Sequence, residues 1–141
     1  MRILGIDHGD ARIGLALSDE LGMLAHPLET LDGRDKFKAT ARKLAELIAA
    51  KQIERIIIGL PRNMNGTYGP AADKIRDFVE KLTPLIAVPI QLWDERMTTQ
   101  QAQRNLHEAG RTVKNSRHVI DQAAAVIILQ SYLDSIAPPS F

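Results

Sequence analysis

The beginning of the chain places an acidic side chain inside an apolar strand and then turns directly into a second strand. Residues 2–9 and 11–19 are apolar and β-prone, and Gly9-Asp10 joins them, which predicts a β-hairpin. Asp7 falls within the first of these strands. An ionised carboxylate inside a folded domain is costly unless it is paired, hydrogen-bonded or bound to a cation. The hairpin therefore predicts a fold that supplies Asp7 with such a partner.

Length and composition favour a single globular domain. The chain has 141 residues, of which 45% are hydrophobic and 25% charged, and this is enough for a full core. Its formal net charge is +1, so a surface that binds nucleic acid would be basic locally rather than over the whole protein. The lack of cysteine excludes disulfides and thiolate zinc sites, and it fits a cytoplasmic location. No apolar run approaches the roughly 20 residues that span a bilayer, so we expect no membrane association.

The rest of the chain alternates between predicted helices and strands. A third strand at 23–32 suits a sheet edge or a bulge because it contains Pro27. Asp32 can cap the helix that follows it. Residues 111–117 are polar and cationic without periodicity, which predicts a basic loop. The pattern of apolar residues predicts, in order, a helix, a strand, a helix, a strand and a last helix, at about 34–51, 53–59, 71–83, 88–93 and 118–136. A capping box of Thr98 with Gln101, and Gly110 as a stop, predict a further helix at about 98–109.

This order of elements is typical of an α/β sheet that starts with an antiparallel meander and continues with parallel strands. It matches the ribonuclease-H-like fold, a mixed five-stranded sheet flanked by helices. In that arrangement the first strand is central and neighbours the strand at 53–59, so Asp7 would lie near the edge where the loop at 62–70 emerges. Ligands bind at this carboxyl edge in open α/β sheets. We expect residues 1–137 to form the domain and 138–141 to form a short disordered tail.

Three acids lie where buried charge is least expected. Asp7 lies in the first strand, Glu95 directly follows the strand that ends at Trp93, and Asp121 lies in an apolar helix. Clustered carboxylates need cations to offset their repulsion, and carboxylate oxygens suit Mg²⁺ or Mn²⁺. Two such ions can activate water and stabilise the leaving oxygen in phosphodiester hydrolysis. The combination of the three acids therefore favours a metal-dependent nuclease.

Each acid considered alone has a structural alternative. Asp7 could hydrogen-bond within its glycine-rich turn, and Asp121 could interact favourably with a helix dipole. Glu95 could form a surface ion pair with the adjacent Arg96. Glu95 also follows a strand that we expect to be one removed from Asp7, so its side chain has to reach inward. Asp94 is the alternative ligand at that position.

Four ordered motifs carry a resemblance to a known family. They are Gly5-Ile6-Asp7-x-Gly9-x-x-Arg12-Ile13-Gly14, Gly59-Leu60-Pro61 with Asn65-Gly66, Asp94-Glu95-Arg96-x-Thr98-Thr99, and Asp121-x-x-Ala124-Ala125-x-x-Ile128-Leu129-Gln130. Over essentially the whole chain they resemble the YqgF (RuvX) family of RuvC-like Holliday-junction resolvases, which are regarded as nucleases that process the precursor of the ribosomal small-subunit RNA.

The resemblance implies a site as well as a fold. It implies divalent-metal-dependent phosphodiester hydrolysis, with Mg²⁺ or Mn²⁺ as the cofactor. The residues that match the catalytic and metal-binding acids of the family are Asp7, Glu95 and Asp121. Related resolvases use a fourth acid near the last helix, and no second acid stands beside Asp121 in this sequence. The number of metal ions, one or two, therefore stays open.

Six residues are candidates for contacts with nucleic acid, and each of the cations among them could equally be a solvated surface charge. Contacts to phosphates would make binding weaken as salt is added. Asn65-Gly66-Thr67 could offer amides and a hydroxyl to a phosphate, or it could form a simple turn. The candidates are Arg12, Arg62, Asn65, Arg96, Lys114 and Arg117.

The expected function is an endonuclease that acts on structured RNA, with the 5′ end of the 16S rRNA precursor as its target and ribosomal precursor particles as partners. The alternative is a resolvase of branched DNA. A non-catalytic RNA-binding or ribosome-associated module is also compatible with the sequence. The choice between RNA and DNA depends on contacts that no motif here encodes. Oligomeric state, a monomer or a weak homodimer, and cleavage-site specificity stay open as well.

A kinase-like function fits only one part of the sequence. Asp7-x-Gly9 with Gly14 also resembles the first phosphate motif of the actin-like and sugar-kinase ATPases. Those proteins need two such domains around the nucleotide, and the sequence has no second copy of the motif. A Walker A motif and a GxGxxG motif are absent as well. Phosphate binding of that kind would therefore rest on a single hairpin.

Overall fold

The computed structural model describes residues 1–63, 65–95 and 117–137, and in the last of these ranges the side chains of residues 117–121 are left out. Three predictions lie outside the described residues: the helix at 98–109, most of the basic loop at 111–117, and the tail at 138–141. Within the described ranges, none of the helices has the length and apolarity that a bilayer crossing requires.

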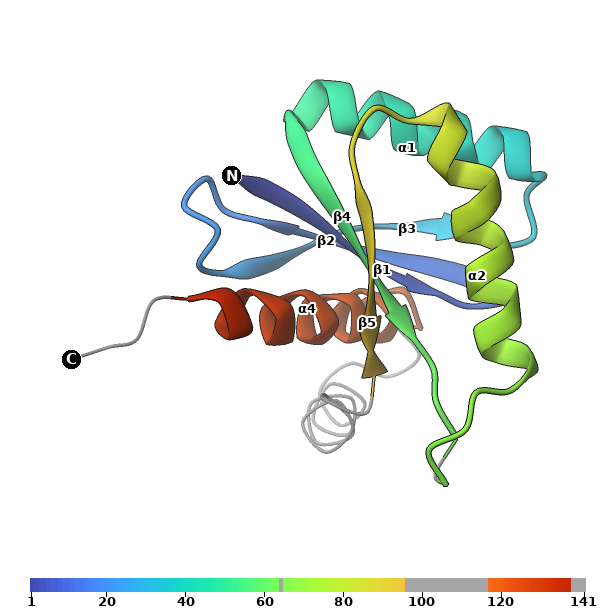
Figure 1. Cartoon of the computed structure of the whole chain (residues 1–141). Coiled ribbons are helices and arrows are strands. Elements are labelled where there is room, and N and C mark those ends of the chain that lie inside the picture. Colours follow the sequence, from blue (N-terminus) through green and yellow to red (C-terminus); the bar gives the residue numbers. More distant parts are fainter. Residues whose placement is uncertain (64, 96–116, 138–141) are drawn as a thin grey trace.

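A five-stranded sheet forms the centre of the protein (Figure 1). The sheet order is β3-β2-β1-β4-β5. The first three strands pair antiparallel, whereas β4 pairs parallel with both β1 and β5. The predicted ribonuclease-H-like sheet with a central first strand is therefore confirmed. The strands are β1 Arg2–His8, β2 Arg12–Ser18, β3 Ala25–Asp32, β4 Ile53–Leu60 and β5 Ile90–Asp94.

Helices cover both faces of this sheet (Figure 1). The helices α1 Phe37–Lys51 and α2 Pro70–Leu82 lie on one face, and α4 Arg117–Ile136 lies on the other. A short 3₁₀ turn, η1 Thr83–Leu85, continues α2. Because β1 is buried on both faces, its apolar side chains alternate between two separate core clusters.

The residues of β1 show how closely the layers pack. Leu4 and Ile6 belong to the core under α1 and α2, whereas Ile3 belongs to the core under α4. At Gly5 a Cβ atom would lie 2.7 Å from the Cβ of Leu129 in α4, closer than two carbon atoms can approach. A side chain at position 5 would push α4 away from the central strand.

The start of α1 differs from the prediction. Asp32 does not cap this helix, because its Oδ1 accepts hydrogen bonds from the backbone N–H and from Nε of Arg34, at 2.9 and 3.1 Å. The helix begins later, at Phe37, and its N-cap residue Lys36 makes no side-chain cap bond. An aspartate can satisfy nearby backbone groups in a turn as readily as at a helix start, and the local turn forms here.

The third strand matches the prediction for a proline-containing edge. β3 is the outermost strand next to β2. Their register shifts between Leu15, which pairs with Glu29, and Ala16, which pairs with Pro27. Proline has no N–H to donate to a neighbouring strand, so an irregular pairing at a sheet edge accommodates it.

Candidate active site

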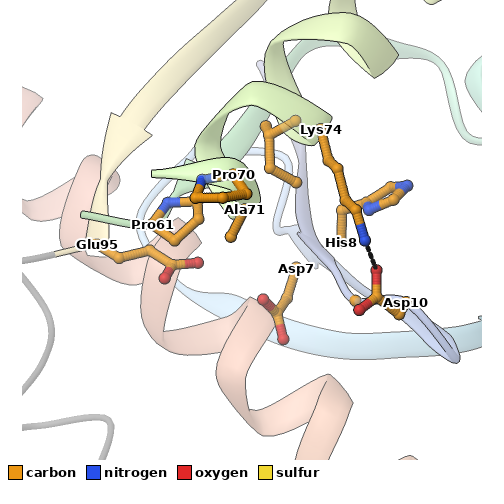
Figure 2. Close-up of a pocket in the computed structure, with 10 residues that line it drawn as sticks. Asp7, His8, Asp10, Pro61, Pro70, Ala71, Lys74 and Glu95 are labelled. Atoms are coloured by element: carbon orange, nitrogen blue, oxygen red, sulfur yellow. Dashed lines mark hydrogen bonds and ion pairs between the residues drawn. The ribbon is translucent and has the colours of Figure 1, made fainter. Parts of the chain in front are cut away.

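Asp7 lies near the carboxyl end of the central strand. It pairs in register with Gly14 of β2, and Ile6 just before it is fully buried. Its side chain lines a cleft of about 330 Å³, which Glu95 lines as well. Figure 2 shows the carboxylates of Asp7 and Glu95 pointing toward one another across this cleft. The structure thus brings together two acids that the sequence places in separate elements.

The cleft lies at the carboxyl edge of the sheet, where the sequence predicts a ligand site. Its walls come from three segments that are distant in the sequence. His8 and Asp10 line it from the end of β1 and the turn after it, Pro61 lines it from the loop after β4, and Ala71 and Lys74 line it from the first turns of α2. The acids therefore face an open space large enough for part of a substrate.

Glu95 reaches this space by passing over β4. Ile6 of β1 pairs with Ile58 of β4, and Gly59 pairs with Trp93 of β5. Gly59 therefore lies between β1, which carries Asp7, and β5, which Glu95 directly follows. A Cβ atom at Gly59 would lie 2.7 Å from Oε1 of Glu95. The side chain of Glu95 therefore occupies the space that any residue other than glycine would fill. Glu95 can therefore reach Asp7 although it follows a strand that is not adjacent to β1.

The surroundings of Glu95 disfavour its charged form. Burial, and to a smaller extent the negative charges of Asp7 and Asp94, together raise the pKa of its carboxyl from the ordinary 4.5 to about 7. A nearby cation would reverse this effect, and a set of carboxylate oxygens fits a hard divalent ion such as Mg²⁺. The residues present therefore fit the metal that the sequence predicts.

The third predicted ligand is not described. Asp121 belongs to α4 by its backbone, but its side chain lies outside the described residues. Among the side chains that the structure does describe, no group of three or more histidines or acids is arranged to hold a metal ion. The ligand set of Asp7, Glu95 and Asp121 stays a prediction, and the geometry described so far concerns its first two members.

Arg62, a predicted phosphate contact, instead connects the loop after β4 to the end of β5. Its Nη1 lies 2.8 Å from Oδ2 of Asp94, and only 30% and 27% of the two side chains is exposed. The guanidinium also donates from Nε to the carbonyl oxygen of Gly66 and lies 4.9 Å from the ring centre of Tyr68. The bond to Asp94 raises the pKa of Arg62 above its ordinary value. Asp94, the alternative ligand, is thus held from the side by Arg62, next to Glu95.

The segment Asn65-Gly66-Thr67 forms a turn. Oδ1 of Asn65 accepts hydrogen bonds from the backbone N–H and the hydroxyl of Thr67, at 3.1 and 2.6 Å. Gly66 has a φ of +87°, a conformation that favours glycine. Arg12, another predicted contact, is half-buried at the start of β2. The remaining candidates lie outside the described side chains: Arg96, Lys114 and Arg117.

The sequence did not single out the charged pair at the mouth of the cleft. Nζ of Lys74 lies 3.0 Å from Oδ1 of Asp10 (Figure 2). His8 packs its ring 4.5 Å from the ring of Phe78, and burial lowers the pKa of its imidazole. The sequence does contain a feature that could have predicted Lys74 as a cleft residue. Lys74 lies in the second turn of a helix that follows the loop at 61–69 and so begins at the ligand-binding edge.

Comparison with known proteins identifies the family. A family model described as "RuvX: Holliday junction resolvase" matches residues 1–135. The chain belongs to the RuvX family. Two relatives of this RuvX protein are named "Putative pre-16S rRNA nuclease". The relative from Pelotomaculum thermopropionicum is 45% identical over 139 residues, 99% of this chain and 90% of that protein. The one from Listeria monocytogenes is 44% identical over 138 residues, 96% of this chain and 99% of that protein.

Solved structures agree on the fold. Thermus thermophilus RuvC in complex with a Holliday junction substrate has a TM-score of 0.59 at 15% identity, covering 96% of this chain and 94% of that one. The structure titled Thermus thermophilus RuvC has the same TM-score at 14% identity. At such low identity the likeness shows the fold alone. Family membership confirms the resemblance found in the sequence and the predicted enzyme class, a nuclease that acts on nucleic acid.

Proposed function

We propose that this RuvX protein is a divalent-metal-dependent endonuclease that processes the 5′ end of the 16S rRNA precursor by hydrolysing phosphodiester bonds in structured RNA. One observation carries the proposal: the carboxylates of Asp7 and Glu95 face one another across a cleft at the carboxyl edge of the sheet. The names of the relatives from Pelotomaculum thermopropionicum and Listeria monocytogenes support the precursor RNA as substrate.

Asp7 and Glu95 would hold Mg²⁺ or Mn²⁺, with Asp121 as the third ligand. When bound, the metal would supply an activated water and stabilise negative charge on the phosphate oxygens. The chain contributes placement: β1 fixes Asp7, and the glycine at position 59 leaves room for Glu95. Because the pKa of Glu95 is about 7 without metal, bound metal has to displace a proton from part of the population at neutral pH.

Contacts to nucleic acid would come from the basic residues that the sequence singles out. We propose Arg12, Arg96, Lys114 and Arg117 for this role. Arg62 and Asn65 are secondary candidates, because Arg62 binds Asp94 and Asn65 accepts a hydrogen bond from Thr67. Phosphate contacts imply that RNA binding weakens as salt rises. We further propose that the protein is cytoplasmic and associates with ribosomal precursor particles. Its domain would extend over residues 1–137, and it would be a monomer or a weak dimer.

The decisive experiment compares wild type with Asp7→Asn on a 16S precursor transcript, with MgCl₂, with MnCl₂ and with EDTA. We expect the wild type to cleave only with metal, and Asp7→Asn to cleave at least about a thousandfold more slowly, since it loses a ligand of the metal that catalyses the reaction. Asp35→Asn, which removes an exposed acid bound to Lys43, is the matched control and should cleave normally. Equal cleavage by wild type and Asp7→Asn would exclude the proposed site.

Thermal unfolding gives a readout that is independent of cleavage. Added Mg²⁺ or Mn²⁺ should raise the melting temperature of the wild type, because a ligand that binds only the folded state stabilises it. Asp7→Asn and Glu95→Gln should lose this response and should be at least as stable as the wild type without metal, since one of two repelling carboxylates is gone. A large destabilisation of metal-free Asp7→Asn would instead indicate a structural role for Asp7.

The alternative substrate is branched DNA. It is favoured by the description of the family as a Holliday junction resolvase. A four-way DNA junction is therefore included beside the transcript, and cleavage of the junction alone would favour this function. Metal-independent RNA binding without cleavage would favour a non-catalytic module, and ATP hydrolysis would favour the kinase-like function.

A further inference from the structure

Lys74 stands at the mouth of the cleft that holds the two acids. It lies in the second turn of α2 and lines the cleft together with Asp7 and Glu95. Its ammonium group binds Asp10, 64 positions earlier in the chain, at 3.0 Å. Figure 2 shows the pair on the side of the cleft away from Glu95. A cation at this position would meet the phosphate backbone of any nucleic acid that reaches the acids.

The pair is held loosely. The side chain of Lys74 is 64% exposed and that of Asp10 is 84% exposed, so water competes for both groups. Exposed ion pairs contribute little to stability, and the pair can therefore open at little cost. A phosphate oxygen is as good an acceptor for an ammonium group as a carboxylate is. The first turn of α2, which carries Ala71, forms the neighbouring wall and adds the positive end of the helix dipole.

We propose that Lys74 binds a phosphate group of the nucleic acid in the cleft, and that Asp10 competes with that phosphate for the ammonium group. The proposal rests on the proposed function, because the phosphate belongs to the strand that Asp7 and Glu95 would cleave. It gives the two members of one ion pair opposite effects. Loss of Lys74 weakens binding of nucleic acid, whereas loss of the Asp10 charge strengthens it.

The same helix offers a matched control. Lys81 and Asp77 form an ion pair on α2 with a length of 3.1 Å and with exposed fractions of 59% and 60%. Neither residue lines the cleft. Lys81→Gln and Asp77→Asn therefore change the net charge by the same amount as Lys74→Gln and Asp10→Asn, so they correct for long-range electrostatics.

The test measures binding of a fluorescein-labelled 16S precursor transcript by anisotropy, in EDTA and over a range of salt concentrations. Lys74→Gln should bind about fivefold more weakly than Lys81→Gln and show a salt slope smaller by about 0.7 to 0.9, the loss of one phosphate contact. Lys74→Arg should bind like the wild type, because it keeps the charge. Melting temperatures of all variants should stay close to that of the wild type.

The acid is tested in the opposite direction. Asp10→Asn should bind about two- to fivefold more tightly than Asp77→Asn, since the phosphate no longer competes with a carboxylate for Lys74. The double variant Asp10→Asn/Lys74→Gln should bind like Lys74→Gln, because Asp10 acts through Lys74.

Three results would overturn the proposal: equal binding by Lys74→Gln and Lys81→Gln, weaker binding by Asp10→Asn than by Asp77→Asn, or no binding of the transcript by the wild type. Failure of the proposed function is distinguishable, because it appears as a lack of metal-dependent cleavage while the binding differences persist in EDTA. Conversely, normal cleavage with no effect of Lys74 on binding overturns this inference alone.

Discussion

The two sides of the cleft are built in opposite ways. On the Glu95 side, Glu95 lines the cleft and is supported by the buried Gly59 and by the half-buried ion pair of Arg62 and Asp94. On the Lys74 side, the charged groups of the cleft wall are the exposed pair Lys74 and Asp10. The ion pair on the Glu95 side has exposed fractions of 30% and 27%, against 64% and 84% for the pair on the Lys74 side.

This difference in burial separates two tasks. The proposed role of Glu95 as a metal ligand requires that its carboxylate stay in place, and β4 and the ion pair between Arg62 and Asp94 restrict its movement. A group that binds a passing strand has to exchange partners, and an exposed ion pair does so at low cost. Substitutions on the Glu95 side should therefore change the catalytic rate, and those on the Lys74 side should change binding.

Apart from substitution of the proposed metal ligands themselves, the largest effect is expected at Gly59. A methyl group there would meet Oε1 of Glu95 and Cδ1 of Ile128, both at 2.7 Å, and both are ends of flexible side chains that can move. Gly59→Ala should therefore slow cleavage about a hundredfold by displacing the carboxylate, while the free energy of unfolding falls by only about 1–2 kcal/mol. Single-turnover cleavage and urea unfolding measure the two quantities. A loss of activity no greater than the loss of stability explains would contradict the tight geometry assigned to this side.

Next in size is the pH dependence of stability without metal. The pKa of Glu95 is about 7 in the folded protein and near its ordinary 4.5 when unfolded, so between these values the folded state binds more protons. The stability that Glu95 contributes should therefore fall by about 2 kcal/mol as pH rises from 4.5 to 7, once its partial exposure is allowed for. The lowered pKa of His8 acts in the opposite direction and is common to wild type and Glu95 variants. Urea unfolding in EDTA measures this as the difference between wild type and Glu95→Gln at each pH, and the stability of the wild type relative to this variant should fall as pH rises from 4.5 to 7. Lys74→Gln should keep the pH dependence of the wild type. If Lys74→Gln lost this pH dependence, the two sides of the cleft would not differ as described.

A smaller change is expected for Arg62. Arg62→Gln removes the partner of Asp94 and loosens the residue next to Glu95, so the catalytic rate should fall about tenfold with an unchanged KM. A phosphate contact would instead raise KM. Arg55→Gln is the control, because Arg55 also bonds to a residue of β5, Gln91, and to Tyr132 of α4, but lies near the other end of β4. Steady-state kinetics on the transcript distinguish the two roles.

The smallest effect is expected for the stability of the Lys74 side. Lys74→Gln, Asp10→Asn and the double variant should each change the free energy of unfolding by less than about 0.5 kcal/mol, because both partners are mostly solvated. Chemical denaturation with the full double-mutant cycle measures the coupling. A coupling well above 1 kcal/mol would show that the pair is structural and that the two sides of the cleft are alike.

Much of the fold could be predicted because its signals are local. The apolar hairpin with Asp7, the β-branched run at 53–59 and the spacing of apolar residues in α2 and α4 each define an element without reference to the others. Their order then restricted the sheet to few topologies. The predicted start of α1 was wrong because the sequence around Asp32 fits a turn and a helix cap equally well. The hydrogen bond from the backbone N–H of Arg34 decides for the turn.

The sequence by itself determined which acids to examine, since a carboxylate in an apolar element is visible without any structure. Only the tertiary structure decided how Glu95 reaches Asp7. Gly59 belongs to the strand between them, and its lack of a side chain leaves the space that Glu95 occupies. It also joined Arg62 to Asp94 across 32 positions and Lys74 to Asp10 across 64. Contacts between residues so far apart in the sequence depend on which strand ends meet at one edge of the sheet. The packing of the elements determines this, and the local pattern of residues does not.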